Sequence, residues 1–457
     1  MKIVIVGDGK IGSTLAEQLS WEGHNITIID RSEMPLQQTG QDLDILCVAG
    51  NGATYATQME AGVDTADLLI AVTASDELNL LCCLIAKKLG AKHTIARVRN
   101  PEYAAEFNLI SEDMGLSLTV NPELACATEI ARTLRTPNAI KADSFANGHA
   151  DLLKFQLPSQ SPLAGKALME LSAFTRASVL VCAVERNEQE VYIPTGTFRL
   201  EAGDRISLIA DRKSARTFFR QLHLDVSPIQ QVMIIGGGRI GYYLARQLQE
   251  AGMGVKILEN DLGRCRELSE LLPKADIQHG DGTDEAFLLE AGLAQTDAFV
   301  SLTGMDEENI LMSMYVRKTQ EKCKVITKLN RHSFKKVTET LDLGSVFDPR
   351  TSTSNLICSY VRAMQNSMGS KVETLYKLVG GRVEALEFRV AETSALCGIP
   401  LQKLNLRPNF LLGCINRHGR IIIPSGQDAV EAGDTVVVVT SVSGLKELDD
   451  ILEKRKG

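Results

Sequence analysis

Two glycine-rich loops organise this sequence of 457 residues, each directly after a short apolar run. The loops are Gly7-Asp8-Gly9-Lys10-Ile11-Gly12 and Gly236-Gly237-Gly238-Arg239-Ile240-Gly241. The offset between them is 229 residues, about half the chain. Because a strand followed by G-x-G-x-x-G is typical of the first turn of a dinucleotide-binding unit, the sequence predicts two such units.

An amphipathic helix is expected after each loop. Apolar residues recur at i, i+4 and i+8 from Ile11 in the first copy and from Ile240 in the second. This spacing places them on one stripe of a helix. Gly23 and Gly252 are the expected C-terminal stops.

Each second strand is expected to end in an acidic residue, Asp30 in the first copy and Glu259 in the second. Such a carboxylate accepts hydrogen bonds from the ribose diol of a dinucleotide and repels a 2′-phosphate. The expected ligand is therefore NAD(H), or an adenine nucleotide with a free ribose, rather than NADP(H). Its phosphates are expected at the positive end of the helix dipole, close to backbone that the second glycine leaves bare.

The duplication continues along both halves. Thr73 and Thr303 end a later strand, and each precedes an Asp-Glu-x-Asn motif that opens another helix. The pairs Asn121-Pro122 and Asp348-Pro349 predict one more helix in each copy, with an N-cap and proline at the first helical position. Alternating strands and helices predict a doubly wound parallel α/β sheet in each copy, with the ligand at the carboxyl ends of its strands.

A smaller module follows each Rossmann-like unit and also repeats. Its two copies share an Ala-Gly-Asp turn, at Gly203 and Gly433, next to valine- and isoleucine-rich runs that suggest hairpin strands. Glycine at such a turn serves folding rather than ligand binding. The predicted domains are two Rossmann-like units at 1–140 and 229–367 and two small α+β modules at 141–228 and 368–457.

Composition restricts the possible functions. The net charge of −8 with scattered basic residues disfavours nucleic acid as a partner. The N-terminus leads directly into a strand, and no apolar stretch reaches the length of a membrane span, so a cytosolic protein is expected. The ten cysteines lie mostly in apolar runs without zinc-like spacing, so we expect core thiols in a reducing compartment and no metal site.

A catalytic domain is not evident. Each small module has only about 80 residues, which is small for a substrate domain. The seven histidines are dispersed, and His279, next to a predicted crevice loop, has Ala49 as its counterpart. Arg97 and Arg99 lie at a strand end, where phosphate contact and a solvated edge are equally good interpretations. Two nucleotide sites without attached chemistry favour a sensor.

The order of the four domains, the loop from Gly7 to Gly12 with Asp30, and the paired Glu-Ala-Gly-Asp turns resemble the TrkA family. Its members are peripheral, NAD-binding subunits of bacterial Trk potassium-uptake systems built from RCK domains. The resemblance implies a cytoplasmic regulator, peripheral on the inner membrane, that docks on a Trk-type potassium-translocating subunit. It also implies a homo-oligomeric ring, expected to be a tetramer, in which NAD(H) competes with ATP or ADP.

The resemblance implies binding residues in both copies. In the first copy they are Gly7, Asp8, Gly9, Lys10, Ile11, Asp30, Thr73, Ala74, Arg97 and Arg99. In the second copy they are Gly236, Gly237, Gly238, Arg239, Ile240, Glu259 and Thr303. The second copy departs from the first in having Gly237 for Asp8 and the pair Lys328 and Asn330 for the two arginines, so preference for the same nucleotide stays open.

Two alternatives remain at this point. One is an NAD-dependent oxidoreductase, which would require substrate turnover. The other is a nucleotide-sensing assembly protein with a different partner, which would bind nucleotides without affecting potassium.

Overall fold

The computed structural model describes residues 1–100, 103, 115–136, 138–145, 150–187, 190–224, 227–330, 341–367, 372–378, 382–442, 445 and 447–453. These residues form two compact units. The first unit combines Met1–Ile130, here called lobe 1, with Gln231–Cys358, here called lobe 2. The second unit combines Ala131–Gln230 with Ser359–Gly457.

Lobe 1 is a parallel sheet with strand order β3-β2-β1-β4-β5-β6. The strands are β1 (Lys2–Val6), β2 (Asn25–Asp30), β3 (Leu46–Ala49), β4 (Leu68–Ala71), β5 (His93–Arg97) and β6 (Leu118–Val120). The helices are α1 (Lys10–Trp21), α2 (Glu33–Leu43), α3 (Tyr55–Glu60), the 3-10 turn η1 (Val63–Thr65), α4 (Asp76–Leu89) and α6 (Pro122–Leu134). The predicted doubly wound sheet is confirmed.

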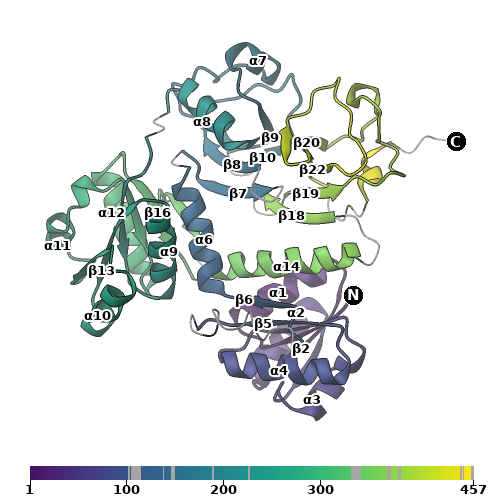
Figure 1. Ribbon diagram of the computed structural model, residues 1–457, viewed down its shortest axis with the longest axis vertical. Helices are drawn as coiled ribbons and strands as arrows, with labels where there is room; N and C mark the ends of the chain where they lie inside the picture. Colours follow the sequence, from purple (N-terminus) through teal and green to yellow (C-terminus); the bar gives the residue numbers. More distant parts are fainter. Residues whose placement is uncertain are drawn as a thin grey trace. The chain divides into compact units, whose positions relative to one another are not determined.

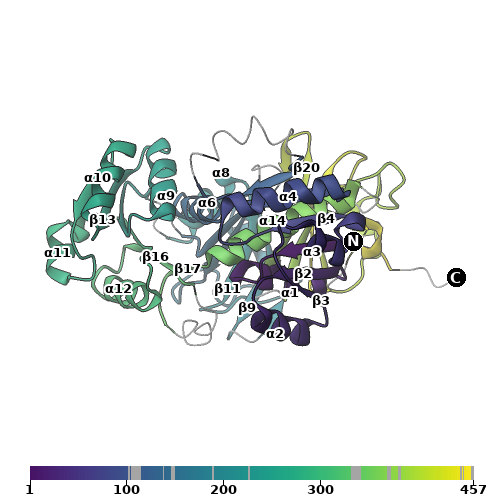
Figure 2. The ribbon, with the colours of Figure 1, turned by 90° about the horizontal axis from the view of Figure 1, so that it is seen from below.

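Lobe 2 repeats this topology in the order β14-β13-β12-β15-β16-β17. Its strands are β12 (Gln231–Ile235), β13 (Gly254–Glu259), β14 (Asp276–His279), β15 (Ala298–Ser301), β16 (Lys324–Lys328) and β17 (Ser345–Phe347). Its helices are α9 (Arg239–Glu250), α10 (Leu262–Leu271), α11 (Glu285–Glu290), η4 (Leu293–Gln295), α12 (Asp306–Thr319) and α14 (Pro349–Ser367). Helices α9 and α10 cover one face of the sheet, and α11 and α12 cover the other (Figure 2).

The last helix of each lobe contacts the other lobe. Helix α6 lies beside α9 of lobe 2, and α14 lies beside α1 of lobe 1 (Figure 1). Gln247 Nε2 of α9 donates to the Thr128 hydroxyl of α6 at 3.0 Å. On the other side, the Cys358 thiol of α14 donates to Gln18 Oε1 of α1 at 3.3 Å. The two lobes therefore exchange their final helices.

The predicted helix starts at the Asn-Pro and Asp-Pro pairs are confirmed. Asn121 Oδ1 accepts the backbone N–H of Leu124 at 2.9 Å, as an N-cap does. Asp348 Oδ1 accepts the N–H of Arg350 at 2.9 Å. Both helices thus begin where the sequence predicts.

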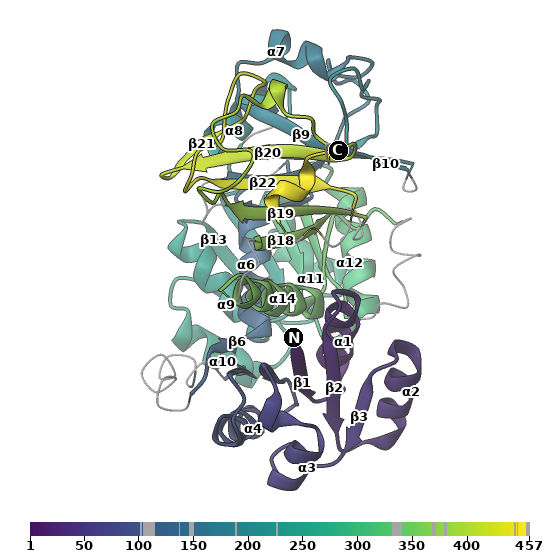
Figure 3. The same ribbon diagram turned by 90° about the vertical axis from the view of Figure 1, so that its right-hand side faces the viewer.

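The second unit contains two antiparallel sheets of the same strand order, β10-β9-β11-β8-β7 and β21-β20-β22-β19-β18. The first sheet has β7 (Lys141–Phe145), β8 (Ala150–Gln156), β9 (Val179–Arg186), β10 (Glu190–Tyr192) and β11 (Arg205–Ala210), with η3 (Leu168–Glu170), α7 (Leu171–Phe174) and α8 (Arg212–Gln221). The second has β18 (Val372–Leu378), β19 (Val383–Arg389), β20 (Phe410–Arg417), β21 (Arg420–Ile422) and β22 (Thr435–Thr440), with η7 (Leu401–Lys403) and η8 (Leu448–Ile451). Strands β18, β19, β22 and β20 lie side by side in Figure 3.

The two small modules share one apolar core. It joins Phe145, Leu152 and Ile209 of the first module to Val383 and Val437 of the second, all buried. Neither sheet therefore buries this face alone. Burial of apolar side chains from both modules is what holds the second unit together.

The Ala-Gly-Asp turns have the predicted glycine at positive φ, 89° at Gly203 and 87° at Gly433. The apolar run after the first turn is the antiparallel strand β11, as predicted, and it pairs with β8 and β9 rather than with the segment directly before the turn. The turn is held instead by Arg186, which ion-pairs with Asp204 at 2.9 Å and Glu201 at 2.6 Å. These contacts with Arg186 of β9 stabilise the turn.

Within the described ranges, no helix combines the length and the apolar character needed to cross a bilayer.

Candidate functional site

The first glycine-rich loop has the backbone that a phosphate cradle requires. Gly7 has φ 105°, a backbone conformation that residues other than glycine rarely adopt. A Cβ on Gly12 would lie 1.8 Å from the Gly7 carbonyl oxygen, so only glycine lets α1 approach the loop. A Cβ on Gly9 would meet nothing within 4 Å. The Gly9 backbone therefore faces open space at the N-terminus of α1, where a phosphate group fits.

The loop of lobe 2 repeats this geometry. Gly236 has φ 97°, and a Cβ on Gly241 would lie 2.5 Å from the Gly236 carbonyl oxygen. A Cβ on Gly238 would again meet nothing within 4 Å. Both lobes therefore keep the close helix packing and the open backbone position.

The acidic residues at the ends of β2 and β13 are held by backbone amides in the same way. Asp30 accepts the N–H of Asp8 at 2.7 Å and that of Ser32 at 2.9 Å, one on each carboxylate oxygen. Glu259 accepts the N–H of Gly237 at 2.7 Å and that of Asp261 at 2.9 Å. Each carboxylate is fixed next to its loop and keeps lone pairs for ribose hydroxyl groups.

The difference between Asp8 and Gly237 has a local cause. The Asp8 carboxylate accepts the Thr39 hydroxyl of α2 at 2.9 Å. In lobe 2 the position equivalent to Thr39 is Leu268, and a Cβ on Gly237 would lie 2.3 Å from its side chain. Desolvation, and secondarily Asp30, raise the pKa of Asp8, while Thr39 lowers it. Lobe 1 therefore has a polar pair at this position, Asp8 with Thr39, and lobe 2 has an apolar pair, Gly237 with Leu268.

The Asp-Glu-x-Asn motif braces the strand ends behind each loop. Asn79 accepts the Thr73 N–H at 2.8 Å and donates to the Arg97 carbonyl at 2.9 Å. Asn309 makes the same contacts with Thr303 at 2.9 Å and with the Lys328 carbonyl at 3.1 Å. Both asparagines are fully buried. The sequence shows the motif in both copies, but it does not show that its asparagine links two strand ends. The repetition of the motif was the only signal of such a role.

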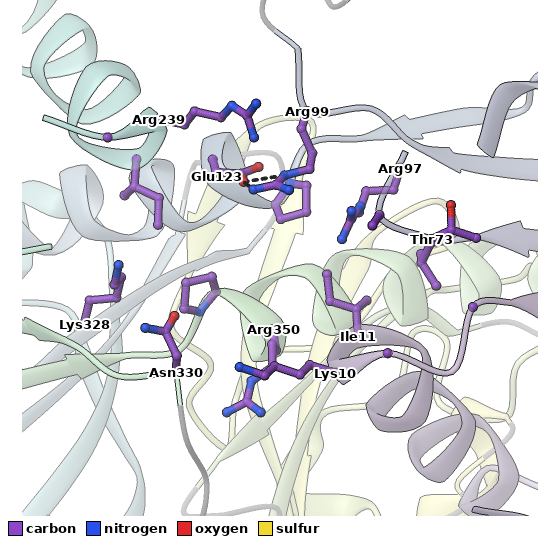
Figure 4. Close-up of a pocket in the computed structure, with 18 of the residues that line it drawn as sticks. Lys10, Ile11, Thr73, Arg97, Arg99, Glu123, Arg239, Lys328, Asn330 and Arg350 are labelled. Carbon is purple, nitrogen blue, oxygen red and sulfur yellow. Dashed lines mark hydrogen bonds and ion pairs between the residues drawn. The ribbon is translucent and has the colours of Figure 1, made fainter. Parts of the chain in front are cut away.

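A cavity of about 720 Å³ lies between the two lobes, within the first unit. Both loops line it, through Gly9 and Gly238, and the neighbouring residues Lys10 and Arg239 are labelled in Figure 4. Its cationic lining residues are Lys10, Arg97, Arg99, Arg239, Lys328 and Arg350. Asp30 and Glu123 are the acidic residues of the lining. This excess of positive charge suits a ligand with several phosphate charges.

The prediction for the ligand residues can be compared with this lining. The predicted residues that line the cavity are Gly7, Gly9, Lys10, Ile11, Asp30, Thr73, Ala74, Arg97, Arg99, Gly238, Arg239 and Ile240. Of the described residues, the predicted ones outside the lining are Asp8, Gly236, Gly237, Glu259 and Thr303. The lining residues outside the predicted set are Val72, Pro122, Glu123, Gly241, Leu302, Lys328, Asn330, Pro349 and Arg350. Of these, Lys328 and Asn330 enter the prediction only as the counterparts of Arg97 and Arg99.

Arg97 and Arg99 face the cavity rather than forming a solvated edge. Arg99 Nε donates to Glu123 Oε1 at 2.7 Å, and this pair is visible in Figure 4. Glu123 is only 8% exposed, and its Oε2 has no hydrogen-bond partner among the described residues. Desolvation, followed by repulsion from Arg99, lowers the pKa of Arg97. An anion beside Arg97 would favour its charged form and so oppose this lowering of the pKa.

Lobe 2 presents a different set of polar groups. Lys328 donates from Nζ to the Leu302 carbonyl at 3.1 Å and is only 8% exposed, and its desolvation lowers the pKa of its ammonium group. Asn330 is bound to Asp306, and Arg350 pairs with Asp348 at 2.9 Å. Arg350 takes the position that Glu123 has in lobe 1. The two halves of the cavity are thus similar in backbone and different in charge.

The residues fit a phosphate-bearing nucleotide. The open backbone at Gly9 and Gly238 suits phosphate groups, and Asp30 and Glu259 suit a ribose diol. The Nε of Arg97 is buried and has no hydrogen-bond partner in the described part of the chain. No group of three or more His, Cys, Asp or Glu side chains in the described ranges could hold a metal ion.

Fold and site together define a protein with two Rossmann-like lobes that share a cationic cavity. A family model for the TrkA-N domain matches residues 3–122 and 232–349, and one for the TrkA-C domain matches 152–223 and 385–453. The chain therefore belongs to the TrkA family, the family that its sequence resembles.

Relatives match along the whole chain. A Trk system potassium uptake protein TrkA homolog of Methanosarcina mazei is 32% identical, over 98% of this chain and 99% of its own. The Trk system potassium uptake protein TrkA of Halomonas elongata is 31% identical, over 96% and 95%.

Solved structures share the fold. The RCK domain of GsuK has a TM-score of 0.61 at 16% identity and covers 96% of this chain and 92% of its own. The GsuK channel bound to NAD also has a TM-score of 0.61, at 17% identity, and covers 96% and 76%.

Proposed function

We propose that this chain is a nucleotide-sensing regulatory subunit of a Trk-type potassium-uptake system. The observation that carries the proposal is the repeated site: both lobes keep a phosphate-cradling loop and an anchored acidic residue, and both loops open into one cationic cavity. A ligand that prefers one arrangement of the lobes would shift the balance between arrangements. That shift is the signal that a membrane partner would receive.

The relatives support the potassium part of the proposal. Full-length relatives are named as Trk system potassium uptake proteins, and one structure of similar fold is a channel bound to NAD. We infer that NAD(H) binds in both lobes and that ATP or ADP competes with it. In each lobe the loop and the cavity cations would hold the phosphates, and Asp30 or Glu259 would hold the ribose.

The remaining parts of the proposal concern assembly and location. We infer that the chain acts on the cytoplasmic face of the inner membrane, bound to a potassium-translocating subunit, as part of a tetramer. We infer no catalysis, because the cavity is built from groups that bind anions. Turnover of NADH with any substrate would contradict this part.

Binding is tested by calorimetry with NADH on the full chain. Asp30→Ala should weaken binding at the first site by about 1–3 kcal/mol, because charge-assisted hydrogen bonds to the diol are lost. Glu259→Ala should do the same at the second site. Asp64→Ala removes an exposed acid of lobe 1 outside the cavity lining and serves as the matched control. Unchanged NADH affinity in the Asp30 and Glu259 variants would contradict the assignment.

Regulation is tested by rubidium uptake in host cells lacking this chain and then resupplied with it. We expect uptake to be lost and then restored by the wild-type chain. The Asp30 and Glu259 variants should restore it to different degrees if the two sites differ in weight. Uptake that does not respond to the chain would contradict the potassium function and leave nucleotide binding to be tested by calorimetry alone.

A further inference from the structure

One side chain connects the lobes at the edge of the cavity. Asn121 caps α6 by accepting the Leu124 N–H at 2.9 Å through Oδ1. Its Nδ2 therefore points the other way and donates to the Tyr243 hydroxyl of α9 at 3.0 Å, with a longer contact of 3.4 Å to the Arg99 carbonyl. Asn121 thus binds the start of α6, the backbone of Arg99 and lobe 2 at once.

The position of Asn121 affects the charged pair of lobe 1. Glu123 lies two residues further along, in the first turn of α6, and pairs with Arg99. Because Asn121 is bound to the Arg99 backbone and caps the helix that carries Glu123, a shift of Asn121 moves both partners of the pair. Arg99 and Glu123 line the cavity, so such a shift changes the anion site.

Tyr243 reports on the loop of lobe 2. It lies in α9 four residues after Arg239, so both residues lie on the same face of this helix. Helix α9 begins directly after Gly238, the open position of the second loop. Tyr243 is only 6% exposed, and its hydroxyl group accepts the Asn121 hydrogen bond in a partly buried position. A movement of α9 when its loop binds a phosphate would reach Asn121 through this hydroxyl.

The Asn121–Tyr243 contact joins lobe 1 to lobe 2, and the equivalent positions of the repeat carry residues of other types. The position equivalent to Tyr243 in lobe 1 is Thr14, whose hydroxyl donates to the Lys10 carbonyl of its own helix at 2.8 Å. The position equivalent to Asn121 is Asp348, whose carboxylate accepts the Arg350 side chain at 2.9 Å. Thr14 and Asp348 each make these contacts within their own lobe.

We propose that Tyr243 and Asn121 are positioning residues that couple the second nucleotide site to the Arg99–Glu123 pair of the first. The proposal rests on the proposed function, because it requires that both lobes bind a nucleotide. Coupling of this kind is reciprocal, so occupation of either site changes the affinity of the other by the same factor.

The test measures a coupling factor with NADH. The full chain gives the product of both stepwise binding constants. Glu259→Ala, titrated at NADH concentrations that leave its weakened second site empty, gives the first site alone, and Asp30→Ala gives the second site in the same way. The ratio of the wild-type product to the product of the two single-site constants is the coupling factor. The same three chains are then made with Tyr243→Phe, which removes the hydroxyl and keeps the ring.

We expect Tyr243→Phe to move the coupling factor toward one by about two- to tenfold, the range for one hydrogen bond. The single-site constants should stay close to their original values. Thr128→Val is the matched control, because it removes the acceptor of another hydrogen bond between the same helices, to Gln247. This control should leave the coupling factor unchanged even if it lowers thermal stability.

Two results would overturn the proposal and can be told apart. A coupling factor of one in the wild-type chain, or one unchanged by Tyr243→Phe, rejects the coupling while leaving nucleotide binding intact. A flat isotherm with the wild-type chain rejects the proposed function as well. Hydrogen exchange at the Leu124 amide gives a readout without ligand, and we expect faster exchange in Tyr243→Phe than in Thr128→Val.

Discussion

The glycines of each loop have different surroundings, which separate their roles. Gly12 and Gly241 lie against the backbone of the first glycine, whereas Gly9 and Gly238 face open space. The first pair is therefore required for folding, because a Cβ would push the helix away from the loop. The second pair is required only when a ligand approaches.

Substitution by alanine should separate these roles. We expect Gly9→Ala to keep the melting temperature of the wild type and to weaken NADH binding, because its Cβ enters ligand space. Gly12→Ala should lower the melting temperature clearly. Overpacking of this kind lowers the free energy of unfolding by about 1–3 kcal/mol or more. Differential scanning calorimetry and titration with NADH measure both effects. Equal melting temperatures of the two variants would contradict the distinction.

Asn79 gives a second prediction at the residue scale. Asn79→Ala leaves the Thr73 N–H and the Arg97 carbonyl without their buried partner, so we expect the free energy of unfolding to fall by about 2–4 kcal/mol. Asn309→Ala should have a similar effect in lobe 2. Urea denaturation measures both. A fall in the free energy of unfolding of less than about 0.5 kcal/mol in either variant would contradict the prediction, and would indicate that water replaces the hydrogen bonds of the asparagine.

Much of each lobe can be predicted from the sequence because its signals are local. The strand, glycine loop, helix and terminal acid lie within about 25 residues, and each has a distinct pattern. Glu123 and Arg350 could not be assigned to the cavity, because they reach it only when α6 and α14 cross between lobes. The strand partner of β11 was equally out of reach, since antiparallel pairing over long separations leaves no local pattern.

At the element scale, single side chains hold strand ends together. Asp67 accepts the Lys2 N–H at the start of β1 and pairs with Lys92, next to β5, at 2.8 Å in each case. These contacts, the Lys92 hydrogen bond first, hold the pKa of Asp67 below its usual 3.8. The equivalent Asp297 accepts the Gln231 N–H at 2.9 Å in lobe 2. One carboxylate in each lobe therefore joins neighbouring strands.

The lowered pKa of Asp67 predicts a dependence of stability on pH. Because the folded chain binds the proton less readily than the unfolded chain, this stabilisation is present above the unfolded pKa and is lost as the pH falls through the folded value. We expect Asp67→Asn to flatten the fall in unfolding free energy as the pH is lowered through and below 3.8. Urea titrations at several pH values measure this slope. An unchanged slope would contradict the prediction.

The arginine clamps of the small modules also act between elements. Arg417 repeats the contacts of Arg186, with Glu431 at 2.6 Å and with Asp434 at 2.8 Å. Asp204 and Asp434 are at most 2% exposed, so each depends on its arginine. We expect Arg186→Lys and Arg417→Lys each to lower the free energy of unfolding by about 1–3 kcal/mol, because lysine cannot make the two-pronged contact. Guanidinium denaturation measures this, and a neutral result would show that charge alone suffices.

At the scale of the whole molecule, the two halves of the chain are joined twice. The lobes exchange α6 and α14, and the small modules share the core around Phe145 and Val437. Neither half therefore encloses its own apolar surface.

A chain cut between Pro228 and Ile229 should accordingly reassemble. We expect the two pieces, made together in one cell, to purify as a 1:1 complex, and each piece made alone to aggregate or self-associate through the same exposed surfaces. Size-exclusion chromatography with mass measurement distinguishes these states. Two pieces that each remain soluble and monomeric would contradict the shared cores.

The different residue pairs at the two loops have a consequence for how the two halves of the chain can evolve. Asp8 with Thr39 and Gly237 with Leu268 are alternative solutions to the same contact, and a side chain at position 237 would clash with Leu268. In a dimer of identical copies, every mutation appears on both sides at once. A single gene that encodes both halves is free of this constraint, so one half can specialise while the other retains the ancestral duty.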